Sequence, residues 1–321
     1  MPPEPTAVPV SADPLRLPPR DKLLLAHERL CAAYACPIPY FHGLDPLSEL
    51  VSSLLSHRTR NADSGRAFKA LRQKFPTWAA VRDAPTHAVQ DAIAVCTWPE
   101  QKAPRVQDVL RRVTERRRAA GAPAGEELSL DFLAALSPAD ARAWLGQMPG
   151  VGPKTQAAVL SFSSLRGRAL PVDSHHHRVA VRLGIIPESL AVGPSHAVME
   201  AMLPPDWDAQ QVYDHHEVLM LHGQRCCFYA APACERCQVL DLCPHGRARL
   251  GGEPAGASVT AAGRPRPSAG GHRGPVEGEG VTGAAGKGSP DPDARPAEAK
   301  PRSSQRRRKS TKPDEGPTLF G

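Results

Sequence analysis

Four cysteines near the end of the apolar part of the chain constrain its fold more than any other feature of the sequence. Their spacing is Cys227-x6-Cys234-x2-Cys237-x5-Cys243. Free thiols have no packing reason to crowd together, so this spacing predicts a soft metal centre held by thiolates. A zinc ribbon separates two C-x2-C pairs by a longer stretch, and a compact [4Fe-4S] cluster therefore suits this spacing better. A zinc site and four cysteines without a metal are the alternatives.

The other four cysteines do not belong to this pattern. Cys226 has no predicted role, and we expect Cys31, Cys36 and Cys96 to be small buried apolar residues. No apolar stretch approaches the roughly 20 residues that span a bilayer, and the proline-rich start of the chain lacks the apolar segment of a secretory signal. We therefore expect a soluble intracellular protein, in the cytoplasm or nucleoid of a bacterium or in the nucleus of a eukaryote, where disulfides are rare.

Glycine and proline divide the chain into one globular unit and two flanking segments. The 35 prolines and 26 glycines concentrate at both ends, whereas residues 21–246 are rich in Leu, Val and Ala. This pattern predicts a folded core over residues 21–246 between a disordered N-terminal segment, residues 1–20, and a disordered basic tail, residues 247–321. The tail holds 14 basic and 8 acidic residues, which is +6 of the formal net charge of +7. Because the core is close to neutral, binding of a polyanion there depends on local clusters of positive charge.

Helical periodicity dominates the predicted core. Apolar residues lie at positions i, i+3, i+4, i+7 and i+8 over residues 47–55, which is one face of a helix; they are Leu47, Leu50, Val51, Leu54 and Leu55. Asp45 and Pro46 are typical of the start of that helix, and residues 137–140 start another one that runs to about Gln147. No run of alternating apolar and polar residues is long enough to suggest a sheet. The sequence therefore predicts an all-α fold.

A short segment with two glycines joins two of the predicted helices. It reads Met148-Pro149-Gly150-Val151-Gly152-Pro153-Lys154-Thr155. Gly150 and Gly152 let the backbone turn sharply and expose N–H groups beside a helix N-terminus, a geometry that binds phosphate. A tight helix–helix connection without a ligand is the alternative.

This hairpin and several later motifs, in the same order, resemble the endonuclease III family of helix-hairpin-helix DNA glycosylases. The later motifs are Val172-Asp173-Ser174-His175 followed by Arg178-Val179, His215-His216, Leu221-His222-Gly223 and the cysteine spacing. The resemblance spans residues 21–246. It implies two helical lobes, a central one over about residues 44–160 and a second one that combines residues 21–43 with residues 161–246 and the cluster. It also implies DNA-backbone contacts from Gly150, Val151, Gly152 and Thr155.

Lys154 and Asp173 are the catalytic residues that the resemblance implies. Lys154 lies one residue inside the helix that begins at Pro153, where the helix dipole disfavours the ammonium form. In bifunctional members of the family, the lysine at this place expels the base and forms a Schiff base, from which β-elimination cuts the strand. Asp173 would stabilise positive charge at C1′ and assist deprotonation of the lysine. A phosphate contact for Lys154 and a helix N-cap for Asp173 are the alternatives.

Two loops of the family fill the gap that remains when a damaged base leaves the duplex. The first corresponds to residues 56–61, with Arg58 where the family has an uncharged amide. The second corresponds to residues 96–103, with Trp98 where a smaller apolar residue is usual. Both departures affect residues that would influence the substrate range, and an ordinary surface or packing role is the alternative for both residues.

The resemblance implies a bifunctional DNA glycosylase and AP lyase of base excision repair that removes oxidised pyrimidines. A monofunctional or mismatch-specific glycosylase and a weakly catalytic DNA-binding paralogue are the alternatives. The expected partner is double-stranded DNA with damaged bases or abasic sites, bound by a monomer. In the tail, Arg306-Arg307-Arg308-Lys309 would add salt-sensitive affinity for DNA. A solvated tail is the alternative for this basic run. The final Thr318-Leu319-Phe320 is loosely similar to peptides that dock on a replication sliding clamp.

Overall fold

The computed structural model describes residues 13–251, and every regular element in this range is a helix. The α-helices are α1 (Pro19–Tyr34), α2 (Pro46–Ser56), α3 (Asn61–Lys74), α4 (Trp78–Asp83), α5 (Thr86–Ala92), α6 (Pro99–Ala119), α7 (Pro138–Leu145), α8 (Pro153–Phe162), α9 (Ser174–Leu183), α10 (Val192–Met202), α11 (Ala209–Arg225) and α12 (Pro244–Arg249). Short 3-10 helices are η1 (Pro14–Arg16), η2 (Asp131–Ala135), η3 (Cys234–Arg236) and η4 (Leu240–Leu242). The predicted all-α fold is confirmed. Within the described range no helix is long and apolar enough to cross a membrane.

The ends of the described range differ in part from the predicted boundaries. η1 and the start of α1 fall within residues 13–20, and α12 ends at Arg249, so these parts of the flanking segments are helical. Residues 1–12 and 252–321 lie outside the described range. The predictions for the rest of the flanking segments, the basic run at residues 306–309 and the clamp-binding end at residues 318–320 therefore stay predictions.

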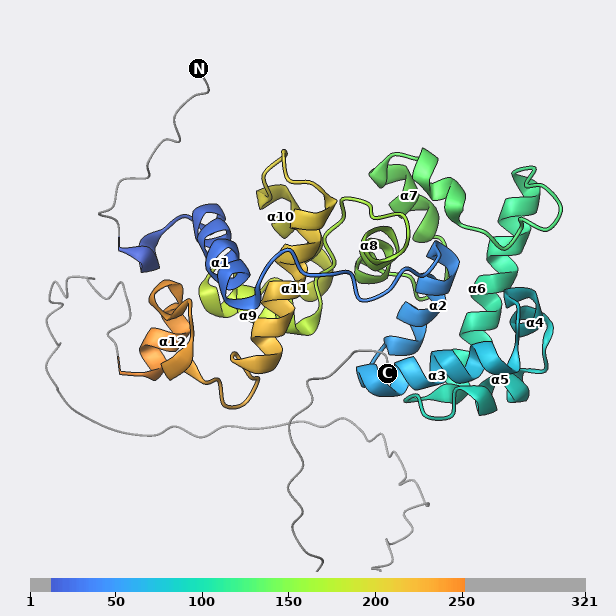
Figure 1. Cartoon of the computed structure of the whole chain (residues 1–321), viewed down its shortest axis with the longest axis horizontal. Helices are drawn as coiled ribbons and strands as arrows, with labels where there is room; N and C mark the ends of the chain where they lie inside the picture. The colour runs from blue at the N-terminus through green and yellow to red at the C-terminus, as the bar shows by residue number, and fades with distance from the viewer. Residues whose placement is uncertain (1–12, 252–321) are drawn as a thin grey trace, which may run out of the picture. The chain divides into compact units, whose positions relative to one another are not determined.

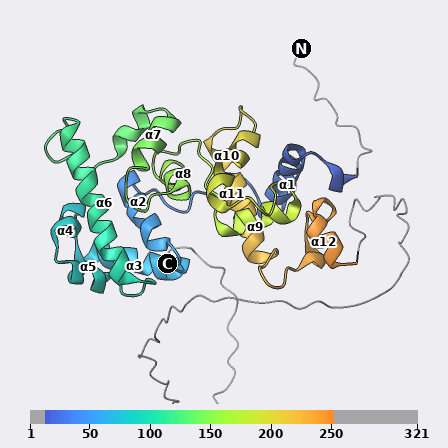
Figure 2. The same ribbon diagram turned by 180° about the vertical axis from the view of Figure 1, so that it is seen from behind.

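The first hydrophobic core is formed by buried side chains between residues 47 and 169. In it α2 packs against α8 and α3, and α6 packs against α4 and α5, as Figures 1 and 2 show. The apolar face predicted over residues 47–55 is the buried face of α2, where Leu50, Val51 and Leu55 are fully buried. Burying a side chain of this size stabilises the fold by about 1.5–3 kcal/mol relative to exposure. This face therefore fixes α2 in the first core.

The second hydrophobic core combines buried side chains of residues 23–30 with others between residues 170 and 243. Here α11 packs against α9 and α1, and both views of the ribbon show these helices together (Figures 1 and 2). A small aromatic cluster in which Phe41 and Tyr213 pack around Phe162 connects α8 of the first core with α11 of the second. The candidate functional site lies next to this connection.

The predicted helix starts agree with the caps in the structure. Asp45 accepts a hydrogen bond from the Ser48 N–H at 2.9 Å, and Pro46 is the first residue of α2. Ser137 caps α7 in the same way, and α7 ends at Leu145, slightly before the predicted end. Each such cap satisfies a backbone N–H that the helix leaves unpaired and stabilises the fold by about 1 kcal/mol.

The prediction for Cys31 and Cys36 is wrong, because they form a disulfide and are only partly buried. α1 ends at Tyr34, and Ala35 adopts a left-handed conformation with φ of 61°. This conformation turns the chain back and brings the two Cα atoms to 4.9 Å, within the range that a disulfide requires. Cys96 is buried, as predicted.

Candidate functional site

The predicted hairpin joins α7 to α8, and Lys154 lies in the first turn of α8. Gly150 has a φ of +78°, a conformation that residues with a Cβ rarely adopt. Its missing side chain also leaves room for Arg105 of α6, since a Cβ on Gly150 would lie 2.9 Å from the Arg105 Nη1 atom. The Arg105 cation and the backbone N–H groups at the start of α8 therefore both favour an anion at the hairpin.

The structure uses two predicted DNA-binding residues of the hairpin for packing. The side chains of Val151 and Thr155 are buried. The Thr155 Oγ1 atom lies 3.0 Å from Nε2 of His57, and the Val151 N–H donates to the Met148 carbonyl oxygen. The hairpin therefore presents its two glycines and the start of α8 to a ligand rather than these two side chains.

Asp173 is the N-cap of α9, which is the alternative role predicted for it from the sequence. Its carboxylate accepts a hydrogen bond from the His176 N–H at 2.7 Å. Lys154 and Asp173 line the same two cavities, and buried His216 is influenced by both charges. Burial lowers the pKa of His216 to about 4, Lys154 adds to this effect and Asp173 opposes it. The two residues predicted to be catalytic therefore lie at one site, at the starts of α8 and α9.

The outer groove is the cavity of about 730 Å³ that Lys154 and Asp173 share with Arg58 and Trp98. Arg58 lies in the loop after α2, Trp98 directly precedes α6, and the Arg58 guanidinium carbon is 5.9 Å from the centre of the Trp98 ring. Both residues have left-handed backbones, with φ of 52° and 53°, a conformation that costs about 1–2 kcal/mol outside glycine. Four residues predicted from the sequence therefore line one surface, and two of them are held in strained positions.

Lys102 of α6 supports this arrangement, although no sequence motif predicts a role for it. Its ammonium group donates to the Thr59 hydroxyl and to a backbone carbonyl at the end of α2, both at 2.6 Å. The cations also act on His57, whose pKa is lowered to about 4 by burial and then by Lys154, Lys102 and Arg105. This clustered positive charge favours a polyanion in the outer groove.

The inner pocket is the second cavity that Lys154 and Asp173 line, together with side chains of α2, α8 and α11. On the α2 side Glu49 is buried, lies 2.9 Å from the His42 Nε2 atom and accepts a hydrogen bond from the hydroxyl of another α2 residue. On the α11 side Glu217 is buried, and burial, with the nearby charge of Asp173 adding to it, raises the pKa of Glu217 to about 8. Apolar walls with a few convergent polar groups are typical of a pocket for a small ligand.

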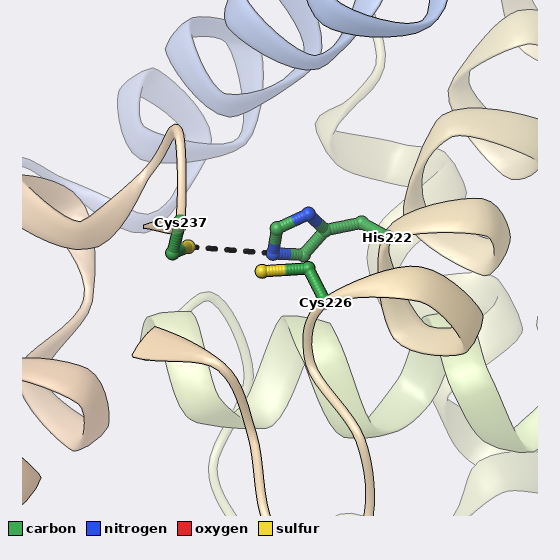
Figure 3. Close-up of side chains that lie close together, drawn as sticks. All are labelled: His222, Cys226 and Cys237. Carbon is green, nitrogen blue, oxygen red and sulfur yellow. Dashed lines mark hydrogen bonds between the residues drawn. The ribbon is translucent and has the colours of Figure 1, made fainter. Parts of the chain in front are cut away.

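All five cysteines of the C-terminal region line one further cavity; they are Cys226, Cys227, Cys234, Cys237 and Cys243. Figure 3 shows that Cys226 and Cys237 point toward His222, and the ligand atoms of these three residues lie within 4.8 Å of one another. Cys226, which the cysteine spacing leaves without a role, therefore lies beside a predicted ligand.

The chemistry of this sulfur cavity fits a soft metal centre. Burial raises the pKa of Cys237 to about 12 and that of Cys243 to about 11. Thiolates grouped in such a place need a cation to offset the loss of hydration. Arg182 of α9 donates to the Cys227 Sγ atom at 3.3 Å and to two carbonyl oxygens of the following loop at 2.7 Å. This contact cannot be predicted from the sequence, because an arginine on an amphipathic helix is usually solvated.

Comparison with known proteins identifies the fold and proteins of similar sequence. No family model matches the chain. A putative DNA glycosylase of Arabidopsis thaliana is 30% identical over 180 residues, and the match covers 56% of this chain and 57% of that protein, less than two thirds of its length. Endonuclease III of Thermotoga maritima is 28% identical over 210 residues, which cover 65% of this chain and 87% of that enzyme.

A solved structure of a trapped endonuclease III–DNA covalent intermediate superimposes with a TM-score of 0.60 at 20% identity. The superposition covers 72% of this chain and 98% of that one, and it shows a common fold. Together with the sequence matches, it shows that the chain is similar in sequence to endonuclease III and shares its fold.

Proposed function

We propose that the chain is a DNA glycosylase of base excision repair that removes oxidised pyrimidines and also cleaves the strand at the resulting abasic site. The observation that carries this proposal is the presence of Lys154 and Asp173 in both the outer groove and the inner pocket. A nucleophilic amine and a carboxylate at one opening are what a lysine-dependent lyase requires.

In this proposal the duplex lies along the outer groove, and the damaged nucleotide turns out of the base stack toward the inner pocket. The hairpin and Arg105 hold the backbone phosphates without reading sequence. Arg58 and Trp98 enter the space that the displaced base leaves. Both are positioned at the groove, and Trp98 is 46% exposed there.

Lys154 then attacks C1′ of the displaced nucleotide, the C1′–N bond to the base breaks, and a Schiff base forms between Nζ and the sugar. β-Elimination from this intermediate cuts the strand. The Asp173 carboxylate stabilises the positive charge that develops at C1′ and takes part in the proton transfers. Its N-cap bond to α9 fixes it in place.

Borohydride reduction of the Schiff base on a duplex with an abasic site tests the lyase chemistry. We expect a covalent adduct with the wild type and with Lys69→Ala, which removes an exposed lysine of α3, and no adduct with Lys154→Ala. Asp173→Asn should keep the cap, because asparagine caps as well as aspartate, and should slow adduct formation by roughly 10²–10⁴-fold.

Two other outcomes would support the alternatives. Release of a damaged base by the wild type without any adduct would indicate a monofunctional glycosylase. Normal binding of damaged DNA with neither base release nor adduct would indicate a DNA-binding paralogue and would overturn the proposed activity.

We also propose that Cys227, Cys234, Cys237 and Cys243 hold a [4Fe-4S] cluster, in keeping with their spacing and with the sulfur cavity. When bound, the cluster would fix the chain between α11 and α12. Cys226→Ser should then keep the iron and sulfide content of the wild type, whereas Cys237→Ser should lose most of both. Equal loss in the two variants, or zinc in place of iron in the wild type, would contradict this assignment.

A further inference from the structure

Glu217 of α11 is a buried carboxyl group without a partner. It is 5% exposed and lines the inner pocket with Lys154 and Asp173. Among residues 13–251 no hydrogen bond or ion pair involves its carboxyl group, whereas Glu49 of the same pocket is paired with His42. Buried glutamates are nearly always paired, and an unpaired one points to a ligand that would satisfy it.

Burial and the charges around Glu217 determine the protonation state in which its carboxyl group would contact a ligand. Asp173 at the start of α9 and Asp214 on α11 add to the effect of burial and raise its pKa to about 8. At neutral pH the group is therefore mostly protonated. A neutral carboxyl group offers one hydrogen-bond donor beside one acceptor, unlike a carboxylate, which only accepts.

This pattern complements the edge of a nucleobase. A pyrimidine with a carbonyl next to a ring N–H, or an amino group next to a ring nitrogen, also carries one acceptor beside one donor. Two hydrogen bonds can therefore form between a neutral carboxyl group and such an edge, and a base that lacks this edge leaves the carboxyl group unpaired, which is strongly unfavourable in a buried site.

We propose that Glu217 is a specificity-determining residue, whose carboxyl group hydrogen-bonds the edge of the base displaced into the inner pocket while Lys154 attacks the sugar. This inference rests on the proposed function. It adds to that function a residue that reads the base rather than the sugar or the phosphate. An abasic site has no base to read, so Glu217 should matter for excision and much less for strand cleavage at a preformed abasic site.

The test compares two reactions of the full chain under single turnover, excision of thymine glycol and strand cleavage at a preformed abasic site. Glu217→Met removes both hydrogen-bonding atoms at similar volume and should lower the ratio of excision to cleavage about tenfold or more. Glu217→Gln keeps one donor and one acceptor and should restore most of this ratio. Glu115→Gln, an exposed glutamate of α6, is the matched control and should leave the ratio unchanged.

The pH profile gives a second readout that a merely structural role would not move. Excision by the wild type should decline above pH of about 8 as Glu217 ionises, and Glu217→Gln should lack this decline. The other titratable groups that face the pocket are Lys154, Asp173, His216, Glu49 and His42, together with Asp214 behind Glu217. All of them remain in the Gln variant, so their contribution is common to both profiles.

Three results would overturn the inference in distinguishable ways. If Glu217→Met excises thymine glycol at the rate of the wild type, the carboxyl group does not hydrogen-bond the base. Parallel loss of excision and abasic-site cleavage would show that Glu217 only supports the fold of the site. A wild type that neither excises thymine glycol nor cleaves abasic DNA would overturn the proposed function and this inference with it.

Discussion

Arg58 and Trp98 have strained backbones at the same edge of the outer groove. Strain of this kind persists only where the surrounding structure enforces it, and it is often found where a ligand binds. Lys102 supplies part of that enforcement, since its ammonium group is bound to the loop that carries Arg58. We therefore infer that the left-handed backbone conformations of Arg58 and Trp98 position their side chains in the outer groove.

Replacement of Arg58 by glycine tests this interpretation. Glycine adopts a positive φ without steric cost, so Arg58→Gly should leave the free energy of unfolding unchanged or raise it by up to about 1 kcal/mol, while lowering excision. Arg66→Gly, in the middle of α3, should lower that free energy by about 1 kcal/mol. Urea denaturation of both variants gives the comparison, and equal destabilisation of the two would mean that Arg58 is not strained.

Single residues also show how far a site can be predicted from sequence. Lys154 and Asp173 are accessible to such reasoning because each lies at a helix start that the sequence marks, with Pro153 in one case and a capping carboxylate in the other. Glu217 is not accessible, because it ends a run of buried polar residues, 214–217, that covers all sides of α11. Helical periodicity cannot tell which of four consecutive residues faces a cavity.

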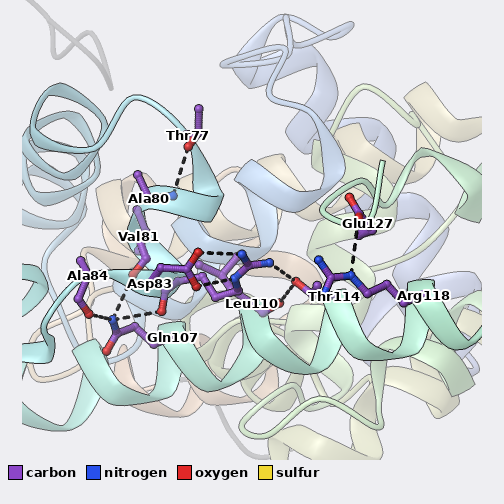
Figure 4. Close-up of polar contacts among 11 residues, drawn as sticks. Thr77, Ala80, Val81, Asp83, Ala84, Gln107, Leu110, Thr114, Arg118 and Glu127 are labelled. Carbon is purple, nitrogen blue, oxygen red and sulfur yellow. Dashed lines mark hydrogen bonds and ion pairs between the residues drawn. The ribbon is translucent and has the colours of Figure 1, made fainter. Parts of the chain in front are cut away.

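At the scale of elements, a buried side chain of α6 binds the C-terminal end of α4. Gln107 of α6 donates to the carbonyl oxygens of Val81 and Ala84 at 3.0 and 2.7 Å and accepts from the Thr86 hydroxyl at 2.7 Å. Figure 4 shows its amide directed at the end of α4. The amide of Gln107 therefore satisfies carbonyl groups at the C-terminal end of α4, and apolar contacts also pack α4 against α6.

Gln107→Leu should lower the free energy of unfolding by about 2 kcal/mol, because it leaves buried carbonyl groups without a donor. Gln101→Leu changes an exposed residue of the same helix and should alter that free energy by no more than about 0.5 kcal/mol. The measurement is the denaturation midpoint with its slope. A Gln107 variant as stable as the Gln101 variant would show that water satisfies the end of α4.

At the scale of the whole molecule, the all-α class follows from the sequence because the apolar residues of α2 and the caps of α2 and α7 are local signals. The pairing of α1 with α11 joins segments far apart in the chain and leaves no local pattern, so only the resemblance to the family implies it. The disulfide of Cys31 and Cys36 is missed for a related reason. It depends on one left-handed residue that the sequence does not mark with glycine or asparagine.

Buried histidines make the stability of the whole molecule depend on pH. The pKa of His57 and that of His216 are lowered to about 4, and those of His176 and His215 lie well below 6.5, chiefly through burial. In the unfolded chain these residues titrate near 6.5, so below that pH the unfolded state takes up protons that the folded state cannot. Their contribution to stability is therefore present above pH of about 6.5 and is lost as the pH falls toward 4.

Glu217 acts in the opposite direction, because its raised pKa lets the folded state keep a proton between pH of about 4.5 and 8. Four histidines outweigh one glutamate, so the free energy of unfolding should fall between pH 7 and 5.5, by about 1.4 kcal/mol per pH unit for each net proton. Urea denaturation at several pH values measures this slope. Glu217→Gln should make this slope steeper, and His87→Gln, at an exposed site, should leave it unchanged. A free energy of unfolding that does not change with pH would contradict this prediction.

The central claim, that the Lys154 amine is the nucleophile, is tested most directly on the unmutated chain. The wild type is trapped with borohydride on a duplex containing an abasic site, the adduct is digested, and mass spectrometry locates the amine that carries the sugar remnant. We predict a single modified peptide, with the modification on Lys154. A remnant on Lys102, on the N-terminal amine or on any other lysine would contradict the claim and assign the Schiff base to another group.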